Sequence, residues 1–521
     1  MLRRISIVLR AASPWLIPLL MLVALGAWSF ASPVGSSPDD DFHLPSIWCG
    51  LGERAGLCED SGDPATKMVP TPLATASCYA FLADNSGECW NPDAAGLFEA
   101  ERVNTGPLYP PVFYGAMSVL ASPDIEASVV AMRLANSLIA VGLVTAVFWV
   151  LPRRLRPALL LSVLASAVPL GVFVYASTNP SSWALLAAAT VWISVFGVTQ
   201  TEGRRRLILC ALAVVGTVMG AGARADAGAF AIFGAGLGLL LGVRRLKQSL
   251  IPLGTFLVVA ALGVGFYLSA GQSGSLVSGL PSDNPPLTRS QLIANAMNIP
   301  TLWTGALGGW GLGWLDTPMP SAVSVCATVI AGAVLLIGAR RPTWREVAAL
   351  VLALAALYAV PFILLAQSRA VVGEQVQPRY ILPLIVILLG VASVGRATER
   401  QWTRSRRLIA AAALTVAFSL ALYTNVRRYT TGLDGTALDP GTFAEWWWPV
   451  APSPLAVTVF GCAAFALALL ALALLAVPIS SNPSATESDA PAETGGRLDE
   501  DVVRADPEHR RSLRTFPRLT T

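Results

Sequence analysis

Three consecutive carboxylates open the polar segment that follows the first apolar run of this chain. Asp39, Asp40 and Asp41 lie in the stretch PDDDFH, which also holds His43, one of only two histidines in 521 residues. A carboxylate at the water interface can act as a general base toward a hydroxyl group held at the membrane surface. The alternative is structural, because Asp is favoured at helix N-caps and in first turns.

Arginines fall near the same expected side of the membrane. Arg133 lies within an apolar run, where a guanidinium is costly and usually functional. Arg224 lies in GAGARADAGAF, with Asp226 as a possible local ion-pair partner, and Arg379 begins another apolar run in VQPRYILP. Because Arg binds phosphate bidentately, these residues are candidate phosphate ligands. The alternative for each is a snorkelling interfacial side chain.

The elements that must position these residues are membrane spans. The chain is 54% hydrophobic and 13% charged, whereas soluble domains carry about 25% charged residues. A span needs roughly 20 apolar residues, which predicts an all-α polytopic membrane protein with about twelve transmembrane helices. The expected spans are 14–32, 127–151, 157–176, 181–200, 206–222, 227–243, 249–270, 319–338, 346–367, 379–396, 408–424 and 454–479.

Basic residues set the expected orientation. More than half of the Lys and Arg residues fall in six segments at alternate ends of the spans, such as LPRRLRP and EGRRRL. The positive-inside rule makes these segments cytoplasmic, so both termini are expected in the cytoplasm of a plasma (inner) membrane protein. The first run could instead be a signal peptide, but its length favours an uncleaved helix. The expected division of the chain is 1–32, 33–126 (the first outward loop), 127–270, 271–318 (outward), 319–479 with the outward loop 425–453, and the disordered cytoplasmic tail 480–521.

Four of the seven cysteines lie in the first outward loop, namely Cys49, Cys58, Cys78 and Cys89. Four extracytoplasmic cysteines suggest two disulfides, with three possible pairings. Pairing of neighbours along the chain is the simplest. A zinc site is the rival interpretation, although no C-x-x-C motif is present.

The other two large outward loops carry tryptophans. In loop 271–318, apolar residues at helical spacing are followed by Trp303, Trp310 and Trp314, which predicts a helix at the outer interface. Loop 425–453 begins with basic residues expected to snorkel and ends in Trp446–Trp448. This cluster is either an interfacial belt or a stacking surface for a sugar or an isoprenoid lipid.

Several function classes lack their motifs. The sequence contains no G-x-x-x-x-G-K-[ST] and no H-E-x-x-H, and a metal site built on two histidines is not expected. Acids and arginines on the outer side, without a nucleotide-binding segment inside, fit a lipid-phosphate substrate whose donor bond already stores the energy. Membrane lipid is then a partner, and nucleic acid is not.

Five short motifs, in order along the chain, resemble a family of predicted membrane proteins of unknown function, DUF2142, which is itself similar to the GT-C superfamily of membrane glycosyltransferases. Asp40 stands where the family pattern has Glu, and Pro378 stands where it has Gly. The motifs are PDDDFH, GPLYPPVFYGAMSVL with Tyr114, MRLANSL with Arg133, STNPSSW with Asn179 and Pro180, and VQPRYILPL with Gln377, Arg379 and Tyr380.

The resemblance implies a GT-C-like fold and an inverting sugar transfer from a polyprenyl-phosphate donor to a cell-envelope glycan or glycolipid acceptor. Asp39 or Asp40 would be the base and His43 would orient it or bind a hydroxyl. Some members of the superfamily use a divalent cation and others do not. The implied substrate-binding residues are Asp41, Tyr114, Arg133, Asn179, Arg224, Gln377, Arg379 and Tyr380.

Two other classes compete with this interpretation. Twelve spans are common among transporters and lipid flippases, which would place charged pairs near the middle of the bilayer. A non-catalytic envelope-assembly protein would use the cysteine-rich loop for binding.

Overall fold

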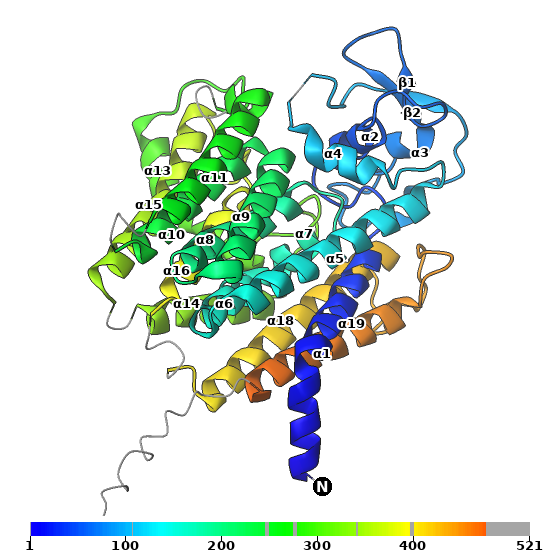
Figure 1. Cartoon of the computed structure of the whole chain (residues 1–521). Coiled ribbons are helices and arrows are strands. Elements are labelled where there is room, and N and C mark those ends of the chain that lie inside the picture. Colours follow the sequence, from blue (N-terminus) through cyan, green and yellow to red (C-terminus); the bar gives the residue numbers. More distant parts are fainter. Residues whose placement is uncertain are drawn as a thin grey trace, which may run out of the picture. The chain divides into compact units, whose positions relative to one another are not determined.

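The computed structural model describes residues 2–106, 108–244, 249–274, 279–339, 342–395 and 401–475. These residues form a helical protein with one small sheet (Figure 1). The tail expected to be disordered, 480–521, lies outside the described residues.

The expected spans are confirmed as helices. In the described part of the chain, ten segments are long and apolar enough to cross a membrane. Two shorter apolar helices, Trp15–Phe30 within α1 (Leu2–Phe30) and α16 (Pro378–Ala392), match the remaining two expected spans. The ten segments are α5 (Ile125–Val150), Arg153–Tyr175 (η2, Arg153–Leu155; α6, Arg156–Ser166; η3, Ala167–Gly171; α7, Val172–Tyr175), α8 (Ser181–Val198), α9 (Gly203–Ala223), α10 (Ala225–Gly242), α11 (Leu250–Ser269), α14 (Ser321–Gly338), α15 (Trp344–Gln367), α18 (Arg404–Thr431) and α19 (Pro454–Leu475).

Two helices, α8 and α16, are the most buried. Every residue of α8 is buried, and so is every residue of α16 except Tyr380. A helix that is apolar all round needs neighbours on every side, and α8 is packed against α9 and α10, while α16 is packed against α6, α8 and α15. The first turn of α16, which carries Arg379, is therefore held by the core of the protein.

Residues 31–124 form a cap beyond the end of α1, opposite the N-terminus (Figure 1). The cap contains strands, which the sequence analysis did not predict. The β2 strand pairs antiparallel with both neighbours, and Met68 lies opposite Glu59 and Glu99. The elements are α2 (Asp40–Trp48), β1 (Glu59–Asp60), β2 (Lys67–Pro70), α3 (Thr71–Ala74), η1 (Gly87–Cys89), β3 (Leu97–Ala100) and α4 (Pro111–Ser118).

Two disulfides staple the cap. Cys49 is bonded to Cys58 and Cys78 to Cys89, which is the simplest pairing of those expected and excludes the zinc alternative for these thiols. Each bridge closes a short loop, and loops of this length gain about 2–3 kcal/mol from chain entropy.

A buried arginine joins the cap to the spans. Arg428 of α18 is completely buried, and its Nη2 lies 3.0 Å from the Asp316 carboxylate. The same guanidinium donates to the carbonyl oxygens of Tyr79, Leu82 and Asn85. The expectation that Arg428 snorkels at the interface is therefore wrong, because its side chain is buried and its terminal nitrogens are bonded to Asp316 and to backbone carbonyls of the cap.

The tryptophan cluster also belongs to this junction. Trp446 and Trp448 are buried, and the indole of Trp448 donates to the carbonyl of Phe30 at 2.8 Å. Trp446 packs closely on Gly87 of the cap. The rings of Trp446 and Trp448 are packed against other parts of the protein. They therefore offer no stacking surface to a sugar or a lipid.

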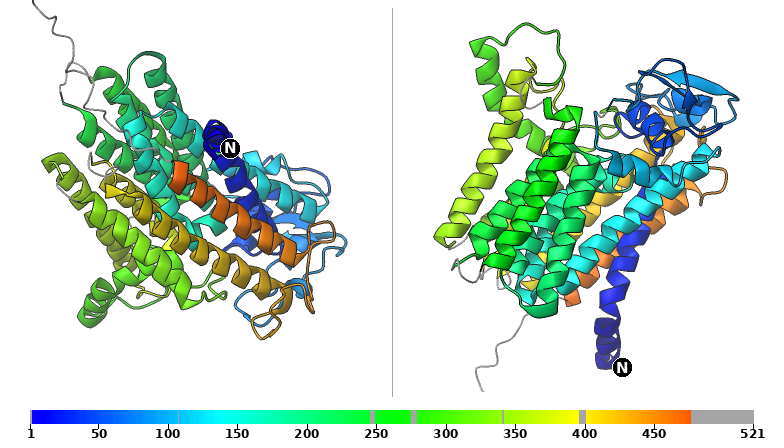
Figure 2. Two further views of the ribbon diagram at one scale, coloured as in Figure 1. Left: turned by 90° about the horizontal axis from the view of Figure 1, so that it is seen from below. Right: turned by 45° about the horizontal axis from the view of Figure 1, so that its top comes forward.

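The helix expected in loop 271–318 is present as α13 (Arg289–Thr304), and two shorter segments flank it, η5 (Gly271–Gly274) and η6 (Gly305–Gly309). The side chain of Thr288 accepts from Gln291 N–H, and that of Gln291 reaches back to Thr288 N–H, which starts α13 with a capping box. In Figure 2, α13 and α15 lie on the side of the protein away from the cap.

Candidate functional site

The segment between α1 and α2 is held by Arg133 of α5. The guanidinium of Arg133 is buried and donates to the carbonyls of Ser32 and Pro33 and to the hydroxyl of Ser36. Carbonyl groups of a non-helical segment at the end of a span need such donors. The candidate phosphate ligand Arg133 therefore has its terminal nitrogens engaged, and we assign it to positioning the acidic segment.

Asp40 is fully buried, with an exposed fraction of 0%. Its carboxylate accepts from the Ser37 backbone N–H at 3.0 Å and from the Thr178 hydroxyl at 3.1 Å. Burial raises the pKa of Asp40 to about 7, against the opposing charge of Arg133. Of the two candidate bases, Asp40 is therefore the fully buried one.

Asn179 supports the same segment from the α7–α8 connection. Its side chain donates to the Pro38 carbonyl at 2.9 Å and accepts from Ser181 N–H. The candidate substrate ligand Asn179 is thus buried against the backbone that precedes the acids. Like Arg133, it positions the segment.

Asp39 differs from Asp40 in conformation and in environment. Its backbone is left-handed, with φ 60°, and its side chain makes no N-cap hydrogen bond to α2, so the capping alternative does not apply to this carboxylate. The side chain is 31% exposed, pairs with Arg379 and lies 3.9 Å from Arg102. Burial would raise its pKa, but the guanidinium of Arg379, with further positive charge around it, holds the pKa below its ordinary value.

Arg379 is the deepest cation of this cluster, with an exposed fraction of 4%. Besides Asp39, its Nη2 lies 3.3 Å from the Tyr380 hydroxyl. Its Nε and Nη1 atoms are buried and have no hydrogen-bond partner in the described part of the chain. Two free donors on one buried guanidinium can bind an anion, because unpaired buried donors are costly.

Arg224 lies in the turn between α9 and α10, and its guanidinium group lies over the ring of Tyr380. Its guanidinium carbon is 5.2 Å from the centre of the Tyr380 ring and 5.9 Å from that of Tyr109. It forms the expected ion pair with Asp226 at 2.8 Å. Since Arg379 lies 5.0 Å from the same Tyr380 ring, one tyrosine brings two cations together.

His43 belongs to an aromatic cluster beneath the acids. Its Nδ1 lies 2.8 Å from the Tyr114 hydroxyl, and both side chains are buried. The ring of His43 also lies 5.4 Å from that of Tyr109. Burial lowers the pKa of His43 to about 3, so the imidazole is neutral at physiological pH.

The structure brings most of the expected residues together. It adds three residues that were not expected at the site, Arg102, Tyr109 and Thr178. Asp41 pairs with Arg102, a 57% exposed residue that the motifs did not reveal. Gln377 is half-buried at the N-cap of α16, and no hydrogen bond of its side chain is present among the described residues. Tyr109 was part of a quoted motif but was not singled out, and Thr178 follows from no pattern in the sequence.

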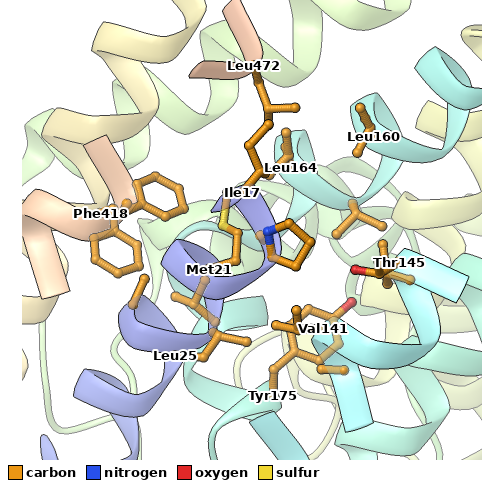
Figure 3. A pocket seen from close by; sticks show the side chains of 18 of the residues that line it. Ile17, Met21, Leu25, Val141, Thr145, Leu160, Leu164, Tyr175, Phe418 and Leu472 are labelled. Carbon is orange, nitrogen blue, oxygen red and sulfur yellow. The ribbon is translucent and has the colours of Figure 1, made fainter. Parts of the chain in front are cut away.

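No group of three or more His, Cys, Asp or Glu side chains within residues 2–475, the stated gaps aside, is arranged to hold a metal ion. An apolar cavity of about 120 Å³ lies elsewhere, between α1, α5, α6, α18 and α19. Figure 3 shows Met21, Val141 and Phe418 among its lining side chains. No Asp, Glu, Lys or Arg residue lines it, so this cavity is separate from the acidic site.

Fold and site define a multi-pass helical membrane protein with a cluster of carboxylates and guanidinium groups where its cap meets its spans. The sequence profile of the predicted membrane proteins DUF2142 matches residues 22–388, and the chain belongs to this family. The resemblance to this family is thereby confirmed.

Known proteins add one further similarity. No curated protein matches the sequence. Among solved structures, the chain is similar to the crystal structure of ArnT from Cupriavidus metallidurans bound to undecaprenyl phosphate. The two share 15% identity over 87% of this chain and 76% of that chain, with a TM-score of 0.41.

Proposed function

We propose that this chain is a GT-C-type glycosyltransferase, which transfers a sugar from a polyprenyl-phosphate donor to a cell-envelope glycan or glycolipid acceptor. The observation that carries the proposal is the contact of Asp39 with Arg379. A partly exposed, ionised carboxylate lies directly beside a buried guanidinium with two free donors. A base for a hydroxyl and a ligand for a leaving phosphate are the two groups that this reaction needs.

The proposed reaction is a single displacement at the anomeric carbon. Asp39 accepts the proton of the acceptor hydroxyl, and the oxygen forms the new glycosidic bond. The bond between the anomeric carbon and the phosphate oxygen breaks, its electron pair stays on the phosphate, and the configuration inverts. Arg379 and Arg224 neutralise the charge on the released polyprenyl phosphate.

The surrounding residues have supporting roles in this proposal. Neutral His43, fixed by Tyr114, packs under the acidic turn and orients it. Asp41 holds Arg102 close to the base. Gln377 and Tyr380, at the half-buried start of α16, face the donor headgroup or its sugar. Asp40 is assigned to the buried support of the turn.

We further propose that the site faces outward from the plasma membrane and that both termini are cytoplasmic. The basic residues at alternate ends of the spans support this orientation. The two disulfides of the cap support it as well, because disulfides persist outside the cytoplasm. The cap, which contains most of the expected first outward loop 33–126, would then lie over the outer leaflet together with loops 271–318 and 425–453.

The test is turnover of a panel of polyprenyl-phosphate sugars by the purified protein in nanodiscs, with a mixture of envelope glycolipids as acceptors. We expect release of polyprenyl phosphate from at least one donor, and its loss in an Arg379→Gln variant. Lys67→Gln, which removes a half-buried cation of the cap, is the matched control and should keep full activity. Tight donor binding without release of polyprenyl phosphate would contradict the proposal and favour a lipid carrier.

A further inference from the structure

Arg379 serves two anions if the proposed function holds. Its Nη2 is committed to Asp39, while its Nε and Nη1 remain without a partner in the described part of the chain. The phosphate of the donor is a diester with two non-bridging oxygens and one negative charge, and guanidinium groups bind such a pair of oxygens bidentately. The two edges through which a guanidinium binds two oxygens are Nε with Nη2 and Nη1 with Nη2. Because both include the Nη2 that pairs with Asp39, a phosphate that binds through either edge competes with Asp39.

Asp39 combines a left-handed backbone with contacts to two cations. Its left-handed φ of 60° is uncommon for a residue other than glycine, although Asp tolerates it better than most. Strained residues of this kind collect at sites where the strain has a use. Its other carboxylate oxygen lies 3.9 Å from Arg102, a largely exposed side chain that also pairs with Asp41.

In the present structure the base is thus masked. A carboxylate that is paired with Arg379 on one oxygen and lies near Arg102 on the other is a poor acceptor for a hydroxyl proton, because both cations stabilise its ionised form. Removal of the Arg379 partner would leave Asp39 more basic and free to turn toward an acceptor.

We propose that Arg379 is an exchange site, where the donor phosphate displaces the Asp39 carboxylate and so releases the base. This inference rests on the proposed function and adds an order to it: the donor binds first, and the acceptor hydroxyl loses its proton only afterwards. Proton transfer and sugar transfer are then coupled to the presence of the lipid phosphate.

The exchange makes an unusual prediction about binding. Asp39→Asn removes the competing charge, so it should bind farnesyl phosphate more tightly than the wild type, by about tenfold, although it has lost its base. Arg379→Gln should bind it at least tenfold more weakly. Asp60→Asn removes an exposed carboxylate of the cap that pairs with Lys67 and should bind like the wild type.

The probes separate the headgroup from the tail. Inorganic phosphate should bind more weakly overall, but its affinity should rise by the same factor in Asp39→Asn. The affinity for farnesol should not rise in this variant. Asp39→Gly serves as a second neutral variant, because glycine adopts left-handed backbone without strain. Phosphate binding is compared only among variants whose thermal midpoint equals that of the wild type. If only one of the two neutral variants folds correctly, its affinity decides the test.

Unchanged or weaker farnesyl phosphate binding in the neutral variants would overturn the exchange, even if the wild type turns over a polyprenyl-phosphate sugar. Tighter binding in both would support it. Failure of the wild type to release polyprenyl phosphate from any donor is a separate result, which would refute the proposed function instead.

Discussion

Burial favours the neutral form of both Asp40 and His43 and so shifts their pKa values in opposite directions, which makes the cap's response to pH a test of the structure. The pKa of Asp40 is raised from an ordinary 3.8 to about 7, and that of His43 is lowered from 6.5 to about 3. Between about pH 4 and 7 the folded protein keeps a proton on Asp40 that the unfolded chain has lost. Its contribution to stability therefore falls as the pH rises.

His43 has the opposite sign. Between about pH 3 and 6.5 the unfolded chain holds a proton that the folded protein lacks, so the contribution of His43 rises with pH. One proton of difference corresponds to about 1.4 kcal/mol per pH unit. The contributions of Asp40 and His43 to the slope of the free energy of unfolding against pH oppose each other from about pH 4 to 6.5. Replacement of one residue reveals the contribution of the other.

The perturbation is therefore a pair of variants, Asp40→Asn and His43→Gln, each compared with the wild type. The assay is the midpoint of thermal unfolding, followed by tryptophan fluorescence in detergent from pH 4.5 to 8. Relative to the wild type, Asp40→Asn should gain stability as the pH rises to about 7, by at most about 4 kcal/mol. His43→Gln should lose relative stability up to about pH 6.5.

Asp60→Asn is the control for this comparison, since its carboxylate is exposed on the cap. Its pH profile should run parallel to that of the wild type above pH 5. Parallel profiles for all three variants would refute the reasoning, because they would mean that neither Asp40 nor His43 titrates differently in the folded protein.

Two further predictions concern the attachment of the cap. Asp316→Ala leaves the fully buried Arg428 without its counter-charge, so it should destabilise the protein by about 3–5 kcal/mol. The control Asp434→Ala, at an exposed position, should change the stability little. Equal thermal midpoints for the two variants would contradict the ion pair. Alkylation of the denatured protein followed by mass spectrometry should modify three cysteines before reduction and all seven after it, and a larger number before reduction would contradict the two disulfides.

The spans were predictable because they depend on local composition. Apolar runs of about 20 residues leave few alternatives to a transmembrane helix, and α5 and α19 lie within a few residues of their expected bounds. The start of α16 was predictable too, because Pro378 fits the first position of a helix. The strands of the cap were not, since β1 has two residues and depends on its partner β2.

The site shows the same division between local and long-range information. Asp39 and Asp40 are identical in type and adjacent, yet only the fold separates them: Asp39 adopts a left-handed turn, while Asp40 begins α2 and points inward. Arg133 was expected to bind phosphate because arginine is rare within spans. Its partners are instead carbonyls about 100 residues away, which no local pattern indicates.

Turnover by Asp39→Asn and Asp40→Asn, measured side by side with whichever polyprenyl-phosphate sugar the wild type accepts, tests the central claim most directly. We expect a loss of at least 100-fold in kcat for Asp39→Asn, the order of magnitude that is typical of a general base. Asp40→Asn should keep most of the wild-type rate at a changed thermal stability. The reverse ranking, or full activity in both variants, would contradict the assignment of the base.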